Sequence, residues 1–228
     1  IQEVYKKLSE SKNPLIVAGN GITISKSRND FLHLIDEIKI PVVTTFNGFD
    51  IIEENNPYYV GRIGVQGTRA GNFALQNCDL LITIGTRNNI RQVSYNWENF
   101  AKKAYKIVVD IDSNELIKKT LKPDIPIIAD AKQFILALLD ICIKNESHNY
   151  DEWIKWCNDR KIKYPVVTPE YRKTKSINPY YFIDILTEKT ASTDTIIAAN
   201  GTASVALMQS AKVKKNQRMF SNSGCASM

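Results

Sequence analysis

The sequence predicts an α/β fold: an open parallel sheet with helices on both faces, followed by the start of a second α/β domain. Two observations lead to this. Short apolar runs of strand length alternate with segments in which apolar residues recur at helical spacing, a pattern typical of parallel strands joined by crossover helices. Small and polar residues follow nearly every apolar run, at the strand ends where such sheets bind ligands.

Each element is predicted from its own pattern. Residues 80–84 (Leu-Leu-Ile-Thr-Ile) form the most hydrophobic run, and residues 25–39 carry Phe31, Leu34, Ile35 and Ile38 on one helical face. The expected strands are 15–18, 41–44, 80–84, 105–110, 125–129, 195–199 and 218–220. The expected helices are 25–39, 68–77, 130–144, 179–190 and a last one that follows Gly201 and ends near 211.

A change in composition predicts the domain boundaries. Residues 1–144 hold the first alternating pattern, and a fresh one begins at 178. Between them, residues 145–177 are charged and aromatic, with Trp153, Trp156, Pro165 and Pro169, which indicates an interdomain linker containing one helix. Residues 178–228 are then the incomplete start of a second domain. Because the sequence starts at Ile1 without a Met or a leader, we expect a fragment of a longer protein.

Composition excludes several classes of protein. Of the 228 residues 43% are hydrophobic and 24% charged, values that exclude disordered, collagen-like and coiled-coil chains. No apolar run approaches the roughly 18–20 residues of a membrane span. The net charge of +6 is spread along the chain, so no nucleic-acid partner is expected. Four cysteines without a C-x-x-C pair and only two histidines predict no metal site, and free thiols favour a cytoplasmic location.

The segments after the first strands form the first candidate site. Gly19-Asn20-Gly21 resembles the start of a dinucleotide fingerprint, but Ile24 stands at the third glycine position and no acidic residue ends the second strand. A tight turn is the alternative. Gly64 to Thr68 precedes a helix, where small residues present backbone N–H groups to an anion.

Two charged pairs follow later strands. Arg87 and Arg91 lie four residues apart after the strand 80–84, where guanidinium groups suit a diphosphate or an adenine edge; the alternative is a surface pair bridged to nearby carboxylates. Asp110 suits a ribose or a metal, whereas Asp112 fits better as the cap of a following helix.

The second domain repeats this layout. Asn200-Gly201-Thr202-Ala203-Ser204 follows a strand and opens a helix, as a phosphate-binding turn does. Cys225, after the last strand, is a weak candidate nucleophile because no His lies near it in the sequence.

Taken in order, these segments resemble thiamine diphosphate-dependent enzymes, most closely the acetolactate synthase branch. The resemblance covers essentially the whole chain. It rests on 61–68, on Asn77-Cys78-Asp79 with the following strand and Gly85-Thr86-Arg87, on Val109-Asp110-Ile111-Asp112, and on Ile127-Ile128-Ala129-Asp130-Ala131.

The resemblance implies a Rossmann-like central domain and the first part of a thiamine diphosphate-binding domain. The positions matching thiamine diphosphate contacts are Gly201, Thr202, Ala203, Gly224 and Met228, with Met228 as the apolar wedge that bends the cofactor. The Gly-Asp-Gly motif that holds Mg²⁺ would lie beyond Met228, and the catalytic Glu in an amino-terminal domain. No catalytic residue and no metal ligand is therefore expected among residues 1–228.

The acetolactate synthase branch also implies FAD in the central domain. The positions matching its contacts are Gly19, Asn20, Gly21, Thr45, Phe46, Gly64, Val65, Gln66, Gly85, Thr86, Arg87, Arg91, Asp110, Asp130 and Ala131. Two departures weigh against the flavin: Asn89 stands where the branch commonly has Asp, and Gln66 where it commonly has His. Relatives of this fold bind another adenine nucleotide there, or nothing.

The activity that the resemblance implies is decarboxylation of a 2-keto acid, followed by transfer or release of the resulting carbanion, in a homodimer or homotetramer. The alternative is a module that binds NAD, FAD or ADP without thiamine chemistry. A purely structural or interaction protein fits poorly with so many small residues at strand ends.

Overall fold

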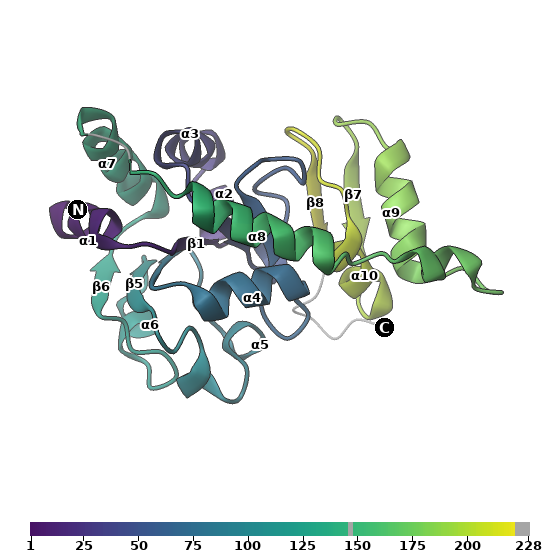
Figure 1. Ribbon diagram of the computed structural model, residues 1–228, viewed down its shortest axis with the longest axis horizontal. Helices are drawn as coiled ribbons and strands as arrows, with labels where there is room; N and C mark the ends of the chain where they lie inside the picture. The colour runs from purple at the N-terminus through teal and green to yellow at the C-terminus, as the bar shows by residue number, and fades with distance from the viewer. Residues whose placement is uncertain (146–147, 222–228) are drawn as a thin grey trace.

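A computed structural model describes residues 1–145 and 148–221. Its centre is a sheet of six parallel strands in the order β3-β2-β1-β4-β5-β6 (Figure 1). The strands are β1 (Pro14–Ala18), β2 (Val42–Thr44), β3 (Tyr59–Arg62), β4 (Leu80–Ile84), β5 (Tyr105–Asp110) and β6 (Ile125–Ile128). The strand order reverses direction between β1 and β4, which is where open parallel sheets bind their ligands.

Helices cover both faces of this sheet, as the sequence predicts. One face carries α1 (Gln2–Glu10), α2 (Gly21–Ile24), α3 (Arg28–Ile38) and α7 (Ala131–Lys144); the other carries α4 (Arg69–Asn77), α5 (Ile90–Val93), α6 (Ser113–Ile117) and α8 (Asp151–Lys163). Alternation along β1 builds both cores, since Ile16 and Ala18 join the first and Leu15 and Val17 the second.

Several elements differ from the sequence prediction. The strand β3 and the helices α1, α2 and α5 were not expected, and the helix expected over 25–39 is α3, which begins only at Arg28. Residues 25–27 separate α2 from α3, and there the Ser25 and Ser27 hydroxyls both donate to the Ile22 carbonyl. Serine side chains compete with the helical backbone in this way, so α2 ends there. Two short 3₁₀ turns, Phe46–Gly48 and Trp97–Asn99, complete the loops.

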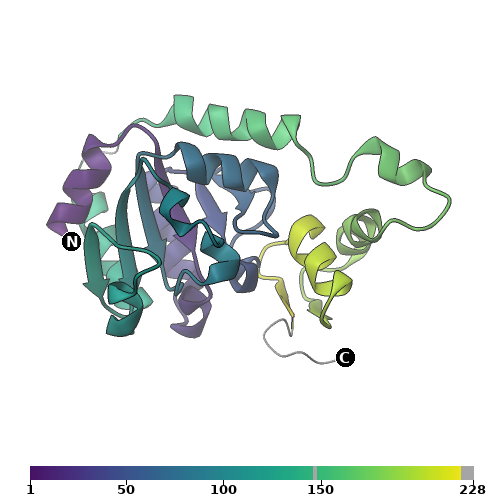
Figure 2. The same ribbon diagram turned by 90° about the horizontal axis from the view of Figure 1, so that it is seen from below.

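The helix expected within 145–177 is α8, and it packs on the sheet unit. Trp153 donates from Nε1 to the Pro14 carbonyl at 2.9 Å, and Lys161 donates from Nζ to the Tyr59 carbonyl at 2.7 Å. Figure 2 shows α8 lying along this unit before the chain crosses to the other side of the molecule. We call the sheet with α1–α8 the first lobe.

The second lobe begins with a 3₁₀ turn at Pro169–Lys173. It contains α9 (Pro179–Lys189), β7 (Thr195–Ala198), α10 (Thr202–Ser210) and β8 (Arg218–Ser221), with β7 and β8 paired in parallel. Leu207, Met208 and Met219 pack with Phe49 of the first lobe. Beside them, the buried Asp50 carboxylate accepts from Arg218 Nε at 2.8 Å and from the Met219 N–H at 3.0 Å.

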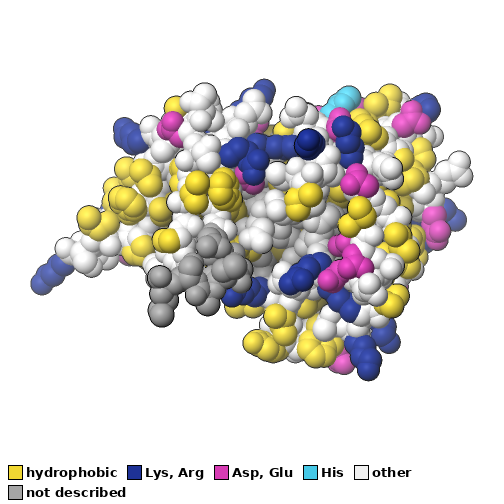
Figure 3. Space-filling view, turned by 180° about the vertical axis from the view of Figure 1, so that it is seen from behind, with side chains coloured by type: hydrophobic (Ala, Val, Ile, Leu, Met, Phe, Trp, Pro, Cys, Tyr) yellow, Lys and Arg dark blue, Asp and Glu magenta, His cyan; other side chains and the backbone are white. Residues whose placement is uncertain are grey.

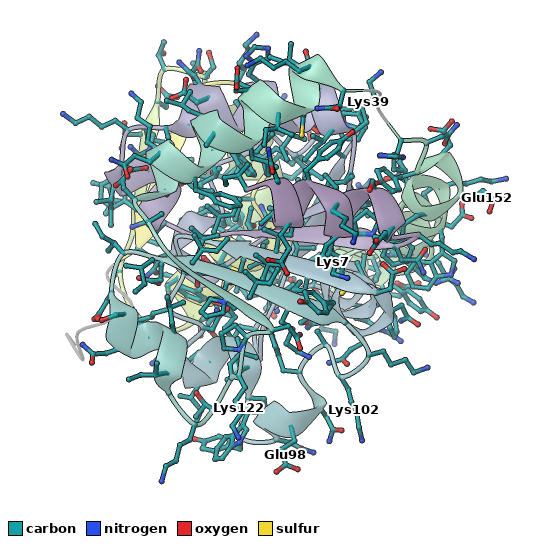
Figure 4. All side chains as sticks on the ribbon, turned by 90° about the vertical axis from the view of Figure 1, so that its left-hand side faces the viewer. Lys7, Lys39, Glu98, Lys102, Lys122 and Glu152 are labelled. Carbon is teal, nitrogen blue, oxygen red and sulfur yellow. The ribbon has the colours of Figure 1, made fainter. Side chains whose placement is uncertain are left out.

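The surface carries mixed charge at the end remote from the second lobe. In Figure 4, Lys7, Lys39, Lys102 and Lys122 spread over this end, with Glu98 and Glu152 at its edges. Within the described ranges, we find no helix whose length and hydrophobicity would allow it to cross a bilayer.

Candidate functional site

A cleft of about 670 Å³ opens at the carboxyl ends of the strands, a volume typical of small-molecule sites. Loops after all six strands of the sheet contribute to it, and Met208 of α10 adds a wall from the second lobe. The space-filling view in Figure 3 shows a hollow between the two lobes, with uncharged groups around it and Lys or Arg side chains at its edge. Because the loops after β1 and β4 both line it, the cleft lies where the order of the strands reverses.

Glycines bring the loops after β1 and β4 into close contact at the cleft. The Gly21 N–H donates to the Gly85 carbonyl at 2.8 Å, and Gly85 has a φ of 62°. A Cβ on Gly21 would lie 2.6 Å from the Gly85 Cα. The Gly19-x-Gly21 pattern thus serves the close approach of two loops, consistent with the tight turn that the sequence left open.

A chain of buried side chains holds the loop after β4. Thr86 Oγ1 donates to Gln92 Oε1 at 2.9 Å, Gln92 Nε2 donates to Asn88 Oδ1 at 2.8 Å, and Asn88 Nδ2 donates to Thr83 Oγ1 at 3.2 Å. Lys118 Nζ contacts the Arg87 and Asn88 carbonyls from outside. These contacts preorganise the loop that carries Arg87 and Arg91, and both arginines line the cleft.

The arginines face a cleft that also contains two carboxylates. Asp110 lines it and accepts from the Asp112 N–H at 3.0 Å, while Asp130 lines it and caps α7 by accepting from the Lys132 N–H at 2.8 Å. Among the residues that the structure describes, no ion pair joins Arg87 to a carboxylate. The Arg87 guanidinium is therefore available to an anionic ligand.

Asp112 has the capping role that its sequence predicts. It is the N-cap of α6, and its Oδ1 accepts from the Asn114 N–H at 2.9 Å. Such a cap contributes about 1 kcal/mol to helix stability. The Asp112 side chain thus stabilises the start of α6, and the residue does not line the cleft.

Four of the five N–H groups in the anion cradle expected at Gly64 to Thr68 donate within the chain. The Gly64 N–H donates to Asn72 Oδ1 at 3.0 Å, and the Val65 N–H donates to the Arg91 carbonyl at 2.9 Å. The N–H groups of Gly67 and Thr68 donate to the carbonyls of Gly64 and Arg62. Because these donors are already used within the chain, they are not offered to a phosphate.

Most of the positions expected to contact FAD or an adenine nucleotide come together in the cleft. They are Asn20, Gly21, Thr45, Phe46, Gln66, Gly85, Thr86, Arg87, Arg91, Asp110, Asp130 and Ala131. Gly19, Gly64 and Val65 do not line it. The sequence reasoning missed Ser25, Ile63, Gln92, Ala129 and Met208, which do. Gln92 and Ala129 lie next to predicted residues in the sequence, but Met208 carries no local signal of its role.

The other expected cofactor positions lie at the start of α10. Gly201 precedes this helix with a φ of 71°, and a Cβ built on it would meet no atom of the described residues within 4 Å. Gly201, Thr202 and Ala203 are exposed. This helix start is therefore open to a ligand, and its backbone N–H groups favour an anion. Gly224, Cys225 and Met228 lie outside the described residues.

The described cysteines are buried or half-buried thiols whose pKa values are raised. Burial raises the pKa of the Cys78 thiol to about 12 and that of Cys142 to about 11, so both remain neutral thiols near pH 7. Burial also raises the pKa of Cys157. Within residues 1–145 and 148–221, no group of three His, Cys, Asp or Glu side chains is arranged to hold a metal ion.

Comparison with known proteins places this cleft in a family. The family described as "Thiamine pyrophosphate enzyme, central domain" matches residues 1–138, which span the whole sheet. The chain belongs to the thiamine pyrophosphate enzymes. Thiamine pyrophosphate is another name for thiamine diphosphate, and the six-stranded parallel sheet agrees with the central domain of that family.

Several relatives within this family are named acetolactate synthase large subunits. The probable acetolactate synthase large subunit of Methanocaldococcus jannaschii is 36% identical over 189 residues, which cover 82% of this chain and 31% of that protein. The acetolactate synthase large subunit of Lactococcus lactis is 31% identical over 228 residues, which cover 100% of this chain and 39% of that protein. The chain thus spans about a third of the length of the curated relatives that it matches.

Proposed function

We propose that this chain is part of a thiamine diphosphate-dependent enzyme that decarboxylates a 2-keto acid and transfers or releases the resulting carbanion, as an acetolactate synthase does. The names of the relatives support this function. The match to the family's central domain favours it over a nucleotide-binding module without thiamine chemistry. When bound, the thiazolium ring supplies the electron sink for decarboxylation.

We assign thiamine diphosphate to the start of α10. The observation that carries this assignment is Gly201, whose positive φ and open surroundings leave room for a phosphate at the end of a nine-residue helix. The N–H groups of Thr202 and Ala203 would donate to the diphosphate, and the helix dipole would favour its charge. Gly224 and Met228 complete the proposed set, with Met228 as the wedge. Residues 1–228 are assigned no Mg²⁺ ligand and no catalytic Glu in this proposal.

We assign an adenine nucleotide, FAD in the first place, to the cleft of the first lobe. Its volume, its glycine floor and the Arg87 guanidinium, which pairs with no carboxylate of the described residues, fit a diphosphate linked to an adenosine. Asp110 would accept from the ribose, and Arg91 would add a second positive charge near the phosphates. Asn89 and Gln66, which depart from the flavin-binding branch, make ADP the second candidate.

The remaining proposals concern the organisation of the protein. We propose a central domain at 1–144, a connecting segment at 145–177 and the start of the diphosphate-binding domain at 178–228, with α8 packed on the central domain. We also propose a homodimer or homotetramer in the cytoplasm. The three described cysteines are free thiols, which agrees with a reducing compartment.

Calorimetry on the full-length protein tests the thiamine diphosphate site. Thiamine diphosphate with Mg²⁺ should bind the wild-type protein, and Gly201→Val should abolish binding, because its side chain occupies the approach to the helix start and disfavours the required φ. Circular dichroism must show a folded variant. Unchanged affinity in a folded Gly201→Val protein would refute the assignment, and wild-type protein that does not bind the cofactor would refute the proposed function.

A further inference from the structure

A buried arginine of the first lobe holds the end of a helix in the second. Arg62, the last residue of β3, has a side chain only 3% exposed. Its Nη2 donates to the Ala211 carbonyl at 2.8 Å and its Nη1 to the Gln209 carbonyl at 3.2 Å. A buried guanidinium is rare in proteins because desolvation is costly. The contacts that offset this cost join segments separated by about 150 residues.

The two acceptors lie at the carboxyl end of α10. Helices leave their last four carbonyls without intrahelical partners, and the helix dipole puts partial negative charge there. Arg62 supplies both hydrogen-bond donors and a positive charge. Glu54 Oε2 lies 3.4 Å from Arg62 Nη1 and partly balances that charge. We call the contacts of Arg62 with the Gln209 and Ala211 carbonyls the clamp. The clamp fixes the position of α10 along its own axis as well as its orientation.

The helix α10 links this clamp to both proposed sites. Its first turn follows Gly201, where we place the diphosphate, and Met208 lines the cleft of the first lobe. Gln209 Nε2 also donates to the carbonyl of Gln66, another cleft residue, at 2.8 Å. A helix of nine residues is about 14 Å long and moves as a rigid rod. A shift at its clamped end therefore displaces its first turn.

Other contacts between the lobes do not depend on Arg62. Asp50 accepts from Arg218 and Met219, and Arg28 Nη1 donates to the Gln217 carbonyl at 3.3 Å. These contacts hold the approach to β8 and β8 itself. Replacing Arg62 should therefore loosen α10 while the second lobe remains docked.

We propose that Arg62 is a positioning residue for the diphosphate site: by clamping the carboxyl end of α10, it places the amino end where the cofactor binds. This inference rests on the proposed function. It adds a residue of the central domain, remote from the cofactor, to those that determine cofactor affinity.

The test uses the full-length protein and calorimetry with thiamine diphosphate and Mg²⁺. Arg62→Met, which keeps the length and removes the donors, should weaken cofactor binding about tenfold or more, equivalent to at least about 1.4 kcal/mol. Arg62→Lys, which restores the charge and one donor, should recover part of the affinity. Arg69→Met is the matched control, because Arg69 is exposed and stacks on the Tyr164 ring at 4.1 Å; its affinity should equal that of the wild type.

Hydrogen exchange separates positioning from general stability. In Arg62→Met the amides of α10 should exchange faster, while those of β1 and β4 keep their protection. A purely structural role would lower the melting temperature and leave the cofactor affinity of the folded protein unchanged, and that result would overturn the inference. So would weaker binding with unchanged exchange in α10. If wild-type protein does not bind thiamine diphosphate, the proposed function fails and this inference fails with it; wild-type binding without an effect of Arg62→Met defeats the inference alone.

Discussion

Gly19 approaches Gly85 so closely that position 19 has no room for a side chain. A Cβ built on Gly19 would lie 2.3 Å from the Gly85 carbonyl oxygen, and the Gly19 N–H donates to the Ile84 carbonyl at 2.9 Å. This contact joins the ends of β1 and β4, where the strand order reverses. It therefore holds together the two loops that carry Gly21 and Gly85 to the cleft.

The first prediction follows from this contact. Gly19→Ala should lower the free energy of unfolding by about 1–3 kcal/mol, as overpacking in a rigid site does. Urea denaturation of the purified protein measures the loss. Gly201→Ala serves for comparison, because a Cβ there meets no atom of the described residues within 4 Å and only the φ of 71° resists it. A loss at Gly19 no larger than at Gly201 would contradict the packing argument.

The second prediction concerns the cleft arginine. Arg87→Ala should weaken FAD or ADP binding by about 1.5–3 kcal/mol, the value of a hydrogen bond to a charged group. Calorimetry measures it, with Arg69→Ala as the control because Arg69 does not line the cleft. Wild-type protein that binds neither FAD, ADP nor NAD at millimolar concentration would remove the nucleotide from the cleft.

The third prediction concerns Gln92, which lies in the middle of the buried polar chain. Gln92→Leu should lower the free energy of unfolding by about 1–3 kcal/mol, because Thr86 Oγ1 and Asn88 Oδ1 both lose their partner in a buried place. The double variant Thr86→Val, Gln92→Leu should recover part of the loss, since it also removes the unpaired hydroxyl. Equal stability of Gln92→Leu and wild type in urea would show that the chain does not stabilise the loop.

The fourth prediction is a loss of stability in alkali. Burial raises the pKa of Cys78 from 9.0 to about 12, so the unfolded chain releases this proton near pH 9 and the folded chain only near pH 12. The unfolded state therefore gains stability as pH rises through that interval, at up to about 1.4 kcal/mol per pH unit for one group. Cys78→Ala should show a shallower fall in the urea midpoint between pH 9 and 10.5; equal slopes would contradict this origin.

Strong local patterns made most of the first lobe predictable. The bounds of β4 and β5 are those that the sequence predicts, because β4 is buried along its whole length and β5 contains the buried apolar run Ile107-Val108-Val109. The strand β3 was missed because Gly61 and Arg62 interrupt its pattern, and α1 because only Val4 and Leu8 of its face are buried. In both cases partners far away in the sequence stabilise the element.

Residues that act through the backbone or across the lobes were not predictable. The spacing of Gly64 to Thr68 suits an anion, and only the structure reveals that Asn72 and Arg91 already occupy the Gly64 and Val65 N–H groups. The role of Arg62 depends on carbonyls near residue 210. No local sequence pattern indicates a contact between residues about 150 positions apart. Glycines that follow predicted strands, by contrast, can be identified directly from the sequence.

The packing of α8 on β1 determines when the first lobe can complete its folding during synthesis. The indole of Trp153 donates to the carbonyl of Pro14, 139 residues earlier. At a synthesis rate of about 5–20 residues per second, roughly 7–28 s pass between the two residues leaving the peptidyl transferase centre. During that time α8 is absent, and the part of the first lobe against which it packs remains uncovered. The first lobe is thus completed only after α8 has been synthesised, and until then the apolar side chains that pack against Trp153 and Cys157 lack these partners.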